Sequence, residues 1–424
     1  MTKQIPKYWQ MKKLGEVCDI KSSKRVHKVD WREKGVPFYR AREIVKLAEN
    51  GFVNNVLFIS KNLFEEFTKL NGSPKEGDIV VSAVGTLGRC YRVKKEDKFY
   101  FKDASVLWFD NFKNINSKYV EYLFLSELVK KQVMNKSMGA TVGTLTITRA
   151  KNIQIPLPPL PEQIRITKIL DETFGKLEIA KKNAEKNLKN AKELFESYLQ
   201  GVFENGGDDF SFSKATEDRW EKKTLGEVID FFNGYAFKSK NFVKESNTQI
   251  IRMGNLYQNK LDLNRHAVFY PDNISNKLKN YILIEDDLII SLTGTTDKED
   301  YGYTVQVPLS NKTLLLNQRI AKIIVLDKEK TLKDFLLYLL LSRTFLDKLY
   351  KTANGTRQAN LSTVTMKGIL VNFPKSLQTQ QKIVKKLDYL STNTKKLEKI
   401  YQQKLDDLDE LKKSLLQKAF EGKL

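Results

Sequence analysis

Three pairs of short polar stretches recur in the two halves of the chain. The pairs are KSSKRVHK (21–28) with FKSK (237–240), VGTLGR (84–89) with TGTTDK (293–298), and MGATVGT (138–144) with NGTRQAN (354–360). Lysine, arginine, serine and threonine on exposed loops can contact phosphates, and arginine and glutamine can pair with guanine and adenine in the major groove. These stretches are therefore candidate nucleic-acid contacts. For any single residue, a solvated loop or a plain turn is an equally good interpretation.

The candidate contact residues are basic or hydroxyl side chains together with one glutamine. They are Lys21, Lys24, Arg25, Thr86, Arg89 and Thr141 in the first half, and Lys238, Lys240, Thr295, Thr296, Arg357 and Gln358 in the second. Arg40 and Arg252 also occupy matching positions, but each follows apolar residues, so a structural role is the alternative for both.

Other chemistry finds no support in the sequence. No GxxxxGK[ST] phosphate loop or glycine-rich cofactor fingerprint is in place. Cys18 and Cys90 are too few for a zinc site or a disulfide framework, and His27 and His266 form no ligand cluster. We therefore expect no catalytic site, no metal and no cofactor.

The net charge supports a polyanionic partner. Lys and Arg number 73 against 51 Asp and Glu, which gives +22, although a lysine-rich genome could account for part of this. The longest apolar run, FLLYLLL (335–341), is too short to cross a membrane, and the N-terminus lacks the apolar core of a signal peptide. We expect a cytoplasmic protein that binds nucleic acid and no membrane.

The chain contains an internal repeat. Trp9 with LGEV (14–17) reappears as Trp220 with LGEV (225–228), GDIVVSAVGT (77–86) as DDLIISLTGT (286–295), and SYLQGVF (197–203) as SLLQKAF (414–420). The offsets stay between 209 and 217 residues. This ordered series predicts two copies of one long unit, with insertions in surface loops.

Each copy changes from short strand-like runs to one long helix. The stretch 119–133 predicts a helix within the first strand-rich part, and IPLPPLP (155–161) ends that part before a long helix begins at Pro161. Apolar residues at three-four spacing predict a seam on which the two long helices pack antiparallel. The seam residues are Ile166, Leu170, Leu177, Leu188, Leu387, Leu397 and Leu408.

With LGEV, GDIVVSAVGT, IPLPPLPEQI, SYLQGVF and the NGT/NLS stretch (354–362) in this order, the chain resembles the specificity subunit of Type I restriction-modification systems. The resemblance covers nearly the whole chain. One departure is FPKSLQTQQKI at the start of the second helix, where the family more often has a Pro-Pro-Leu-Pro-Glu-Gln run. This departure loosens the expected boundary near Lys375.

The resemblance implies an α+β fold with two globular α/β target recognition domains, a pair of long antiparallel helices and a pseudo-twofold internal repeat. The expected segments are recognition domain 1 (1–157), the central helix (158–205), recognition domain 2 (206–374) and the C-terminal helix (375–424).

The same resemblance implies a non-catalytic subunit. Each domain would read one half of a bipartite double-stranded DNA target, while the helices set the gap. The helices, with the seam residues as the partner-binding residues, would also dock two modification subunits, which methylate adenine with S-adenosylmethionine. Restriction subunits would add translocation and cleavage. Two alternatives remain open from the residues: a single-chain DNA nuclease or methyltransferase, and a coiled-coil adaptor that binds only proteins.

Overall fold

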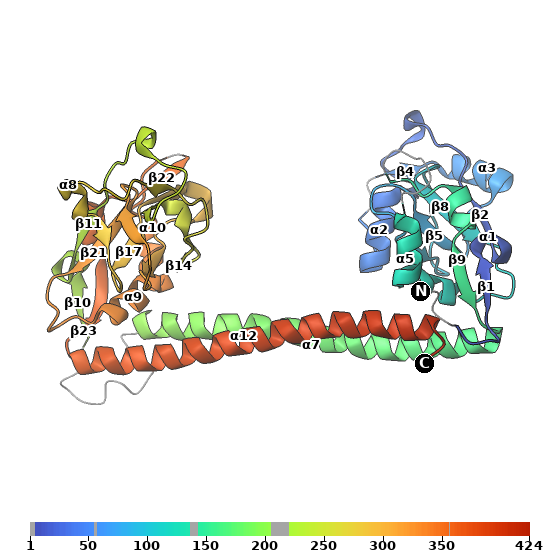
Figure 1. Cartoon of the computed structure of the whole chain (residues 1–424). Helices are drawn as coiled ribbons and strands as arrows, with labels where there is room; N and C mark the ends of the chain where they lie inside the picture. The colour runs from blue at the N-terminus through green and yellow to red at the C-terminus, as the bar shows by residue number, and fades with distance from the viewer. Residues whose placement is uncertain (1–4, 55–56, 136–142, 205–219, 356) are drawn as a thin grey trace. The chain divides into compact units, whose positions relative to one another are not determined.

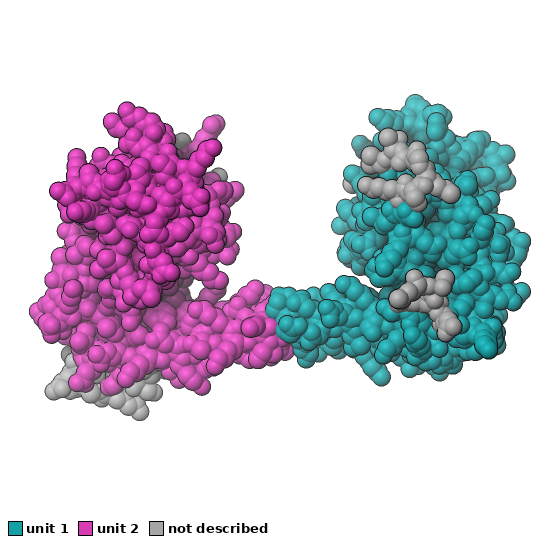
Figure 2. Space-filling model, viewed as in Figure 1, with its two compact units in different colours: residues 1–185, 402–424 teal, residues 186–401 magenta. Residues whose placement is uncertain are grey.

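The computed structural model of the protein describes residues 5–54, 57–135, 143–204, 220–355 and 357–424. It divides into two compact units (Figure 2). Unit 1 comprises Met1–Glu185 and Gln402–Leu424, and unit 2 comprises Lys186–Tyr401. Each unit therefore contains a part of both long helices. Thr141, one of the candidate contacts, lies outside the described residues.

Unit 1 is built on a four-stranded antiparallel sheet with the order β2-β8-β5-β6 (Figure 1). These strands are β2 (Asp19–Lys21), β8 (Val106–Asp110), β5 (Ile79–Ser82) and β6 (Cys90–Arg92). A second sheet contains β4 (Phe58–Ile59), β3 (Val36–Tyr39) and β7 (Tyr100–Phe101), and β1 (Gln10–Lys13) pairs with β9 (Gln154–Leu157). The helices are α1 (Leu14–Val17), α2 (Ala41–Asn50), α3 (Lys61–Asn71), α4 (Ser117–Leu125), α5 (Glu127–Met134) and α6 (Ile147–Lys151).

Unit 2 repeats this topology with one more strand, β16, in its second sheet. Its main sheet has the order β11-β21-β17-β19, with β11 (Ile229–Asn233), β21 (Ile320–Val325), β17 (Leu288–Ser291) and β19 (Thr304–Gln306). The second sheet contains β15 (Phe269–Tyr270), β12 (Thr248–Ile251), β20 (Thr313–Leu316) and β16 (Ile282–Leu283), and β10 (Trp220–Thr224) pairs with β23 (Leu370–Pro374). The helices include α8 (Asn276–Lys279), α9 (Lys333–Leu341), α10 (Arg343–Tyr350) and α11 (Thr363–Lys367).

The LGEV motif has the same structural role in both units. The backbone N–H of Leu14 donates to the carbonyl of Ile153, and that of Leu225 donates to Ile369, each at 2.9 Å. A Cβ on Gly15 or on Gly226 would lie 2.9 Å from the Cβ of Lys151 or Lys367, respectively. The glycine therefore permits a close approach between the motif and the short helix that precedes the last strand of each unit.

The units diverge after the equivalent strands β3 and β12. In unit 1 the chain enters α2, whereas in unit 2 it forms a short 3-10 turn (Met253–Asn255) and a hairpin of β13 (Leu256–Tyr257) and β14 (Lys260–Leu261).

The expected single helix over 119–133 is wrong. The helix is interrupted at Ser126. The hydroxyl of Ser126 accepts a hydrogen bond from the N–H of Val129 and so caps the start of a second helix, α5. Ser342 separates α9 from α10 in the same way. A serine N-cap inside an apolar stretch therefore overrides the continuous apolar pattern.

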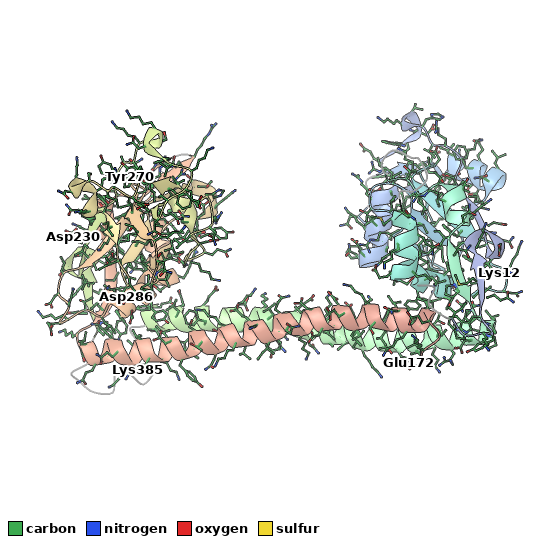
Figure 3. The ribbon with its side chains drawn as sticks, viewed as in Figure 1. Lys12, Glu172, Asp230, Tyr270, Asp286 and Lys385 are labelled. Atoms are coloured by element: carbon green, nitrogen blue, oxygen red, sulfur yellow. The ribbon has the colours of Figure 1, made fainter. Side chains whose placement is uncertain are left out.

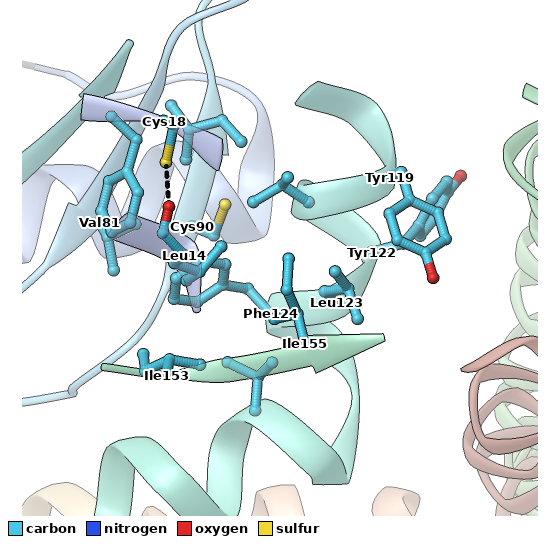
Figure 4. Close-up of a cluster of buried hydrophobic side chains, with 14 of the residues drawn as sticks. Leu14, Cys18, Val81, Cys90, Tyr119, Tyr122, Leu123, Phe124, Ile153 and Ile155 are labelled. Atoms are coloured by element: carbon cyan, nitrogen blue, oxygen red, sulfur yellow. Dashed lines mark hydrogen bonds between the residues drawn. The ribbon is translucent and has the colours of Figure 1, made fainter. Parts of the chain in front are cut away.

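The main hydrophobic core of unit 1 lies between its sheet, α4 and the start of the first long helix, and Figure 4 shows part of it. Both cysteines are buried there, and the thiol of Cys18 donates to the carbonyl of Leu14 at 3.4 Å. Burial, with Asp19 and Asp110 nearby, raises the pKa of Cys18 to about 12. Both cysteines are therefore packing residues rather than nucleophiles.

The two long helices are α7 (Leu160–Glu204) and α12 (Leu377–Phe420), and they pack together antiparallel. In unit 1 the Lys181 ammonium is 3.0 Å from the Asp409 carboxylate, and the Lys412 ammonium lies 5.0 Å from the centre of the Phe174 ring. Charged side chains such as Glu172 and Lys385 point away from the helices (Figure 3). Among the described residues, no helix is long and apolar enough to cross a membrane.

A buried glutamine holds the first turn of each long helix. The amide of Gln163 accepts a hydrogen bond from the N–H of Asn116 at 2.8 Å and donates to the carbonyls of Pro158 and Asn114. Gln380 accepts from the N–H of Leu332 at 2.7 Å and donates to the carbonyls of Lys330 and Pro374. The departure at FPKSLQTQQ therefore retains the glutamine that joins the helix to the loop before α4 or α9.

Candidate nucleic-acid interface

A buried serine anchors the loop after the central strand of each main sheet. We call residues 83–89 of unit 1 and 292–303 of unit 2 the hairpin loops. The hydroxyl of Ser82 donates to the carbonyl of Thr86 at 2.5 Å and accepts from the N–H of Arg89 at 2.9 Å. The hydroxyl of Ser291 accepts from the N–H of Tyr303 at 3.0 Å. Both serines are fully buried, so the base of each loop is fixed while its tip reaches solvent.

A glycine in the left-handed region closes each hairpin loop. Gly88 and Gly302 both have φ of +72°, and their N–H groups donate to the carbonyls of Ser82 and Ser291. A Cβ on Gly88 would lie 3.1 Å from Val133, and one on Gly302 would lie 2.6 Å from Leu349. The loop base therefore packs directly on α5 or α10, and the same arrangement is present in both units.

A second segment crosses each hairpin loop. We call residues 143–146 and 357–362 the crossing segments. In unit 1 the N–H of Leu145 donates to the carbonyl of Ala83 at 2.9 Å, and in unit 2 the N–H of Leu361 donates to Leu292 at 2.8 Å. In unit 2 the contact extends into a strand pair, β18 (Thr293–Thr295) with β22 (Gln358–Asn360). The structure thus brings together, within each unit, two of the three stretches that the sequence marks as candidate contacts.

The candidate contacts of unit 1 are largely engaged with the protein itself. The Lys21 ammonium is 2.7 Å from the Asp110 carboxylate and 3.9 Å from the centre of the Trp108 ring. Lys24 lies over the ring of Phe67, Arg25 binds Asp103 at 2.9 Å, and Arg89 is 3.6 Å from Glu49. The Thr86 side chain is exposed at the tip of the hairpin loop.

The candidate contacts of unit 2 are more open. Lys238, Lys240, Arg357 and Gln358 are all exposed. Gly355, with φ of +116°, allows the tight turn between Asn354 and Asn360, in which Arg357 and Gln358 lie. The two threonines are less available, because the Thr295 hydroxyl donates to Asp300 at 3.2 Å and the Thr296 hydroxyl to the carbonyl of Gly355 at 3.4 Å.

The ionisable groups beneath this loop do not suit acid-base chemistry. Burial and the nearby Glu299 raise the pKa of Tyr350 to about 12, and burial raises the pKa of Tyr301. Both phenols are therefore neutral at physiological pH. Within the described part of the chain, no group of three or more His, Cys, Asp or Glu could hold a metal ion.

The proposed partner-binding residues of the long helices differ in exposure. Ile166, Leu170 and Leu387 are fully buried in the cores of their units, whereas Leu177, Leu188 and Leu408 are half-buried and Leu397 is 38% exposed. Other large apolar side chains on the helices are more open than these, namely Ile164, Ile179, Leu194, Tyr389 and Ile400.

The sequence interpretation missed the role of Arg319 and left that of Arg252 unresolved. Arg319 lies in the turn between β20 and β21, and its carbonyl accepts from the N–H of Leu292 at 2.9 Å, at the base of the hairpin loop. Arg252 precedes Met253, whose sulfur lies 3.0 Å from the Thr293 hydroxyl. Comparison of the two repeats does not point to Arg319, because the equivalent residue of unit 1 is a serine. In unit 1 the N–H of Ala83 donates to the carbonyl of Ser105.

The family model for the Type I restriction modification DNA specificity domain matches the chain twice, over residues 6–190 and 217–406. The chain belongs to this family. It is a DNA specificity subunit of a Type I restriction-modification system, with two target recognition domains, and is a non-catalytic subunit. The alternative of a single-chain nuclease or methyltransferase is therefore set aside.

Two curated relatives match more than nine-tenths of the chain, and a third matches a shorter part of it. The Type I restriction enzyme MjaVIII specificity subunit of Methanocaldococcus jannaschii is 25% identical over 431 residues, which cover 99% of this chain and 94% of the relative. The StySPI specificity subunit of Salmonella potsdam is 23% identical and covers 92% of this chain and 82% of the relative. A putative specificity subunit of Haemophilus influenzae is 32% identical over 161 residues, which are 38% of each chain.

Solved structures share the fold. One, from work on complex assembly and conformational transition of the type I R-M system, has a TM-score of 0.73 at 18% identity and covers 99% of this chain and 100% of that one. The HsdS subunit from Thermoanaerobacter tengcongensis has a TM-score of 0.62 at 18% identity, with both chains fully covered. The expected α+β architecture of two recognition domains with packed long helices is confirmed.

Proposed function

We propose that each unit reads one half of a bipartite double-stranded DNA target. The observation that supports this most directly is that each unit contains its own anchored hairpin loop and crossing segment, held by equivalent residues such as Ser82 and Ser291. Neither set needs a residue from the other unit. A unit with a complete loop face of its own can recognise a half-site independently.

The two globular parts would be the recognition domains, with boundaries near 157, 205 and 374. The bounds of α7 and α12, Leu160–Glu204 and Leu377–Phe420, agree with these limits to within three residues. The helices would set the gap between the half-sites. Residues on the loop faces would contact DNA, with phosphate contacts from lysine and threonine and base contacts from arginine and glutamine.

The long helices would also dock two modification subunits, which carry the S-adenosylmethionine site and methylate adenine, with restriction subunits completing a cleaving complex. Exposed apolar side chains on both helices, such as Ile179 and Tyr389 at 63% and 65% exposure, support this proposal. Large apolar groups in an otherwise charged surface are typical of protein contacts. The similar structure solved in work on type I complex assembly gives further support.

A domain replacement tests this function. The chain is expressed with its modification subunits in a host that lacks other adenine methylation, and the methylated motif is mapped by single-molecule sequencing. We expect a bipartite adenine motif with an unspecified gap. Replacing residues 10–150 by the recognition domain of another specificity subunit should change one half of that motif and leave the other half unchanged.

Two outcomes would contradict the proposal. Simultaneous change of both halves would show that the units do not read DNA independently. The absence of any motif, with an active modification subunit, would favour the alternative of an adaptor that binds only proteins. The adaptor also predicts no salt-dependent DNA affinity, whereas a subunit that neutralises phosphates loses affinity steeply as salt increases.

A further inference from the structure

The arginines of the two units differ in how they are bound. All eight arginines of unit 1 have a partner. Six bind carboxylates, namely Arg25, Arg40, Arg42, Arg89, Arg92 and Arg165, and Arg32 and Arg149 donate to backbone carbonyls. In unit 2, five arginines are described, and only Arg343 forms an ion pair among the described residues, with Glu299 and Asp347.

Backbone contacts or a neighbouring residue bring three of the four remaining described arginines next to one short segment of the hairpin loop, residues 292–296. Arg319 contributes its carbonyl to the N–H of Leu292 at 2.9 Å, and Arg357 contributes its carbonyl to the N–H of Thr296 at 3.4 Å. Arg252 directly precedes Met253, whose sulfur is 3.0 Å from the Thr293 hydroxyl. We call Arg252, Arg319 and Arg357 the arginine cluster. All three are exposed, and within the described residues their guanidinium groups have neither a hydrogen bond nor an ion pair.

Two acidic groups that follow this segment, Glu299 and Asp300, already have other partners. The Asp300 carboxylate accepts from the backbone N–H and the hydroxyl of Thr295. Glu299 pairs with Arg343 at 3.0 Å. Neither of these two carboxylates pairs with the arginine cluster, whose positive charge has no ion-pair partner among the described side chains.

The equivalent positions of unit 1 show how such a cluster could be neutralised. Arg40 corresponds to Arg252, and its guanidinium binds the buried Glu43 carboxylate at 3.0 Å. In unit 2 the residue at that place is Asn255, whose amide oxygen accepts only the backbone N–H of Arg252. With an amide in place of the carboxylate, the Arg252 guanidinium has no ion-pair partner among the described residues.

Unpaired guanidinium groups beside a recognition loop suit guanine. The fork of donors fits O6 and N7 of guanine, and this bidentate contact discriminates against other bases. An arginine already bound to a carboxylate has to give up that partner before it can bind a base, so its net gain is smaller. The arginine cluster of unit 2 is therefore better suited to base readout than the paired arginines of unit 1.

We propose that the arginine cluster reads guanine in the half-site of unit 2. This inference rests on the proposed function, because it assigns a chemistry to one of the two half-sites. Lysine would keep the positive charge but lose the bidentate geometry.

The test uses the complete complex with its modification subunits. Arg252→Lys, Arg319→Lys and Arg357→Lys are compared with Arg343→Lys, an exposed arginine of the same unit that is paired with acids. Methylation is measured on duplexes in which each position of both half-sites is varied, and circular dichroism checks that each variant is folded. In at least one cluster variant, we expect discrimination for guanine at a position of the second half-site to fall about 10-fold or more. Discrimination in the first half-site and in the Arg343→Lys complex should not change.

Several outcomes would overturn the inference while leaving the bipartite function intact. One is unchanged base discrimination in all three cluster variants. Another is a uniform loss of methylation over all sequences in the cluster variants, together with a smaller salt dependence of DNA affinity in the corresponding alanine variants. This result would show that the arginines contact only phosphates. A second half-site that lacks guanine on both strands would also exclude it. The absence of any bipartite motif would instead contradict the proposed function.

Discussion

At the residue scale, Gln163 and Gln380 fix the position at which each long helix leaves its globular part. Both side chains are fully buried, and each makes two hydrogen bonds to backbone groups of the loop before α4 or α9 and one to the segment that leads into its own helix. The family motif around Gln163 is rich in proline, but the second copy shows which feature matters. There Lys-Ser-Leu-Gln (375–378) stands in place of Pro-Pro-Leu-Pro (158–161), and the bonds made by the glutamine persist.

Replacing Gln380 with alanine should destabilise unit 2 by about 3 kcal/mol, since three hydrogen bonds are lost and buried backbone groups are left without partners. Hydrogen exchange in β17 should accelerate, while exchange in β5 of unit 1 should not change. Gln381→Ala is the matched control, because Gln381 is exposed on the next position of the same helix. Equal effects of the two substitutions would show that the buried amide has no special role.

The stability of unit 1 should depend on the ionisation of Glu43. Burial alone would raise the pKa of this carboxyl, but hydrogen bonds from Arg40 and Arg42 outweigh burial and lower it. The carboxylate therefore contributes stability above the pKa of the unfolded chain, about 4.3, and this contribution is lost as the pH falls through the lower folded pKa.

Urea unfolding from pH 7 to pH 3 measures this contribution. Glu43→Gln should lower stability at neutral pH and give a flatter acid dependence than the wild-type chain. Glu65→Gln, at an exposed position of α3, should leave the acid dependence unchanged. Parallel pH curves for wild type and Glu43→Gln would show that the arginine pair does not stabilise the charged form.

At the element scale, the hairpin loop of unit 2 depends on the left-handed glycine at its base. Gly302→Ala should cost about 2 kcal/mol or more, because the left-handed conformation disfavours a Cβ and this Cβ would also lie 2.6 Å from the buried Leu349. The displaced loop should weaken methylation of sites through the second half-site. Hydrogen exchange in β19 and methylation rates measure the two effects.

Gly51 provides the control for this substitution. It has φ of +75° at the end of α2, with no neighbouring atom within 4 Å of a Cβ. Gly51→Ala should therefore cost only the conformational penalty, about 1 kcal/mol, and should not alter the second half-site. An equal cost for both glycines would mean that Leu349 moves aside freely.

The sequence predicted the elements better than their interruptions. The periodic apolar seams placed α7 and α12 to within a few residues, because a long amphipathic helix has many positions that agree with one another. The single helix over 119–133 was wrong, since one serine hydroxyl at Ser126 determines the break and an apolar pattern does not register it. A side-chain hydrogen bond to the backbone, such as the cap made by Ser126, depends on the local backbone conformation, which the apolar pattern does not reveal.

The sequence predicted which loops carry candidate contacts, but it did not predict how these loops lie relative to one another within a unit. The pairing of residues 292–296 with 357–361 depends on a crossing between segments that are far apart in the sequence. The importance of Arg319 depends on the same crossing. The sequence also did not reveal that Arg25 and Arg89 have carboxylate partners, because Asp103 and Glu49 are distant in the chain.

At the scale of the whole molecule, the internal repeat gives each unit a complete fold and a separate candidate surface for DNA. Each unit has its own core, its own loop face and part of both helices. Equivalent residues fill equivalent places, so Tyr119 contacts Phe420 in unit 1 as Phe335 contacts Phe203 in unit 2. Substitutions on one loop face can therefore alter one half of the target without disturbing the scaffold that both units share.

The helices offer a direct test of how the gap is set. Inserting one heptad into each helix, after Glu185 and after Tyr401, keeps the seam in phase and lengthens each helix by about 10 Å, or roughly three base pairs. Three base pairs also rotate the far half-site by about 100° around the duplex, so a smaller increase in the gap is expected. The bases of both half-sites should not change, because the loop faces are untouched. A heptad in only one helix should abolish methylation, since the antiparallel seam can no longer pair along its length. A methylation map with the original gap and full activity after both insertions would show that the helices connect the recognition domains without measuring the distance between their half-sites.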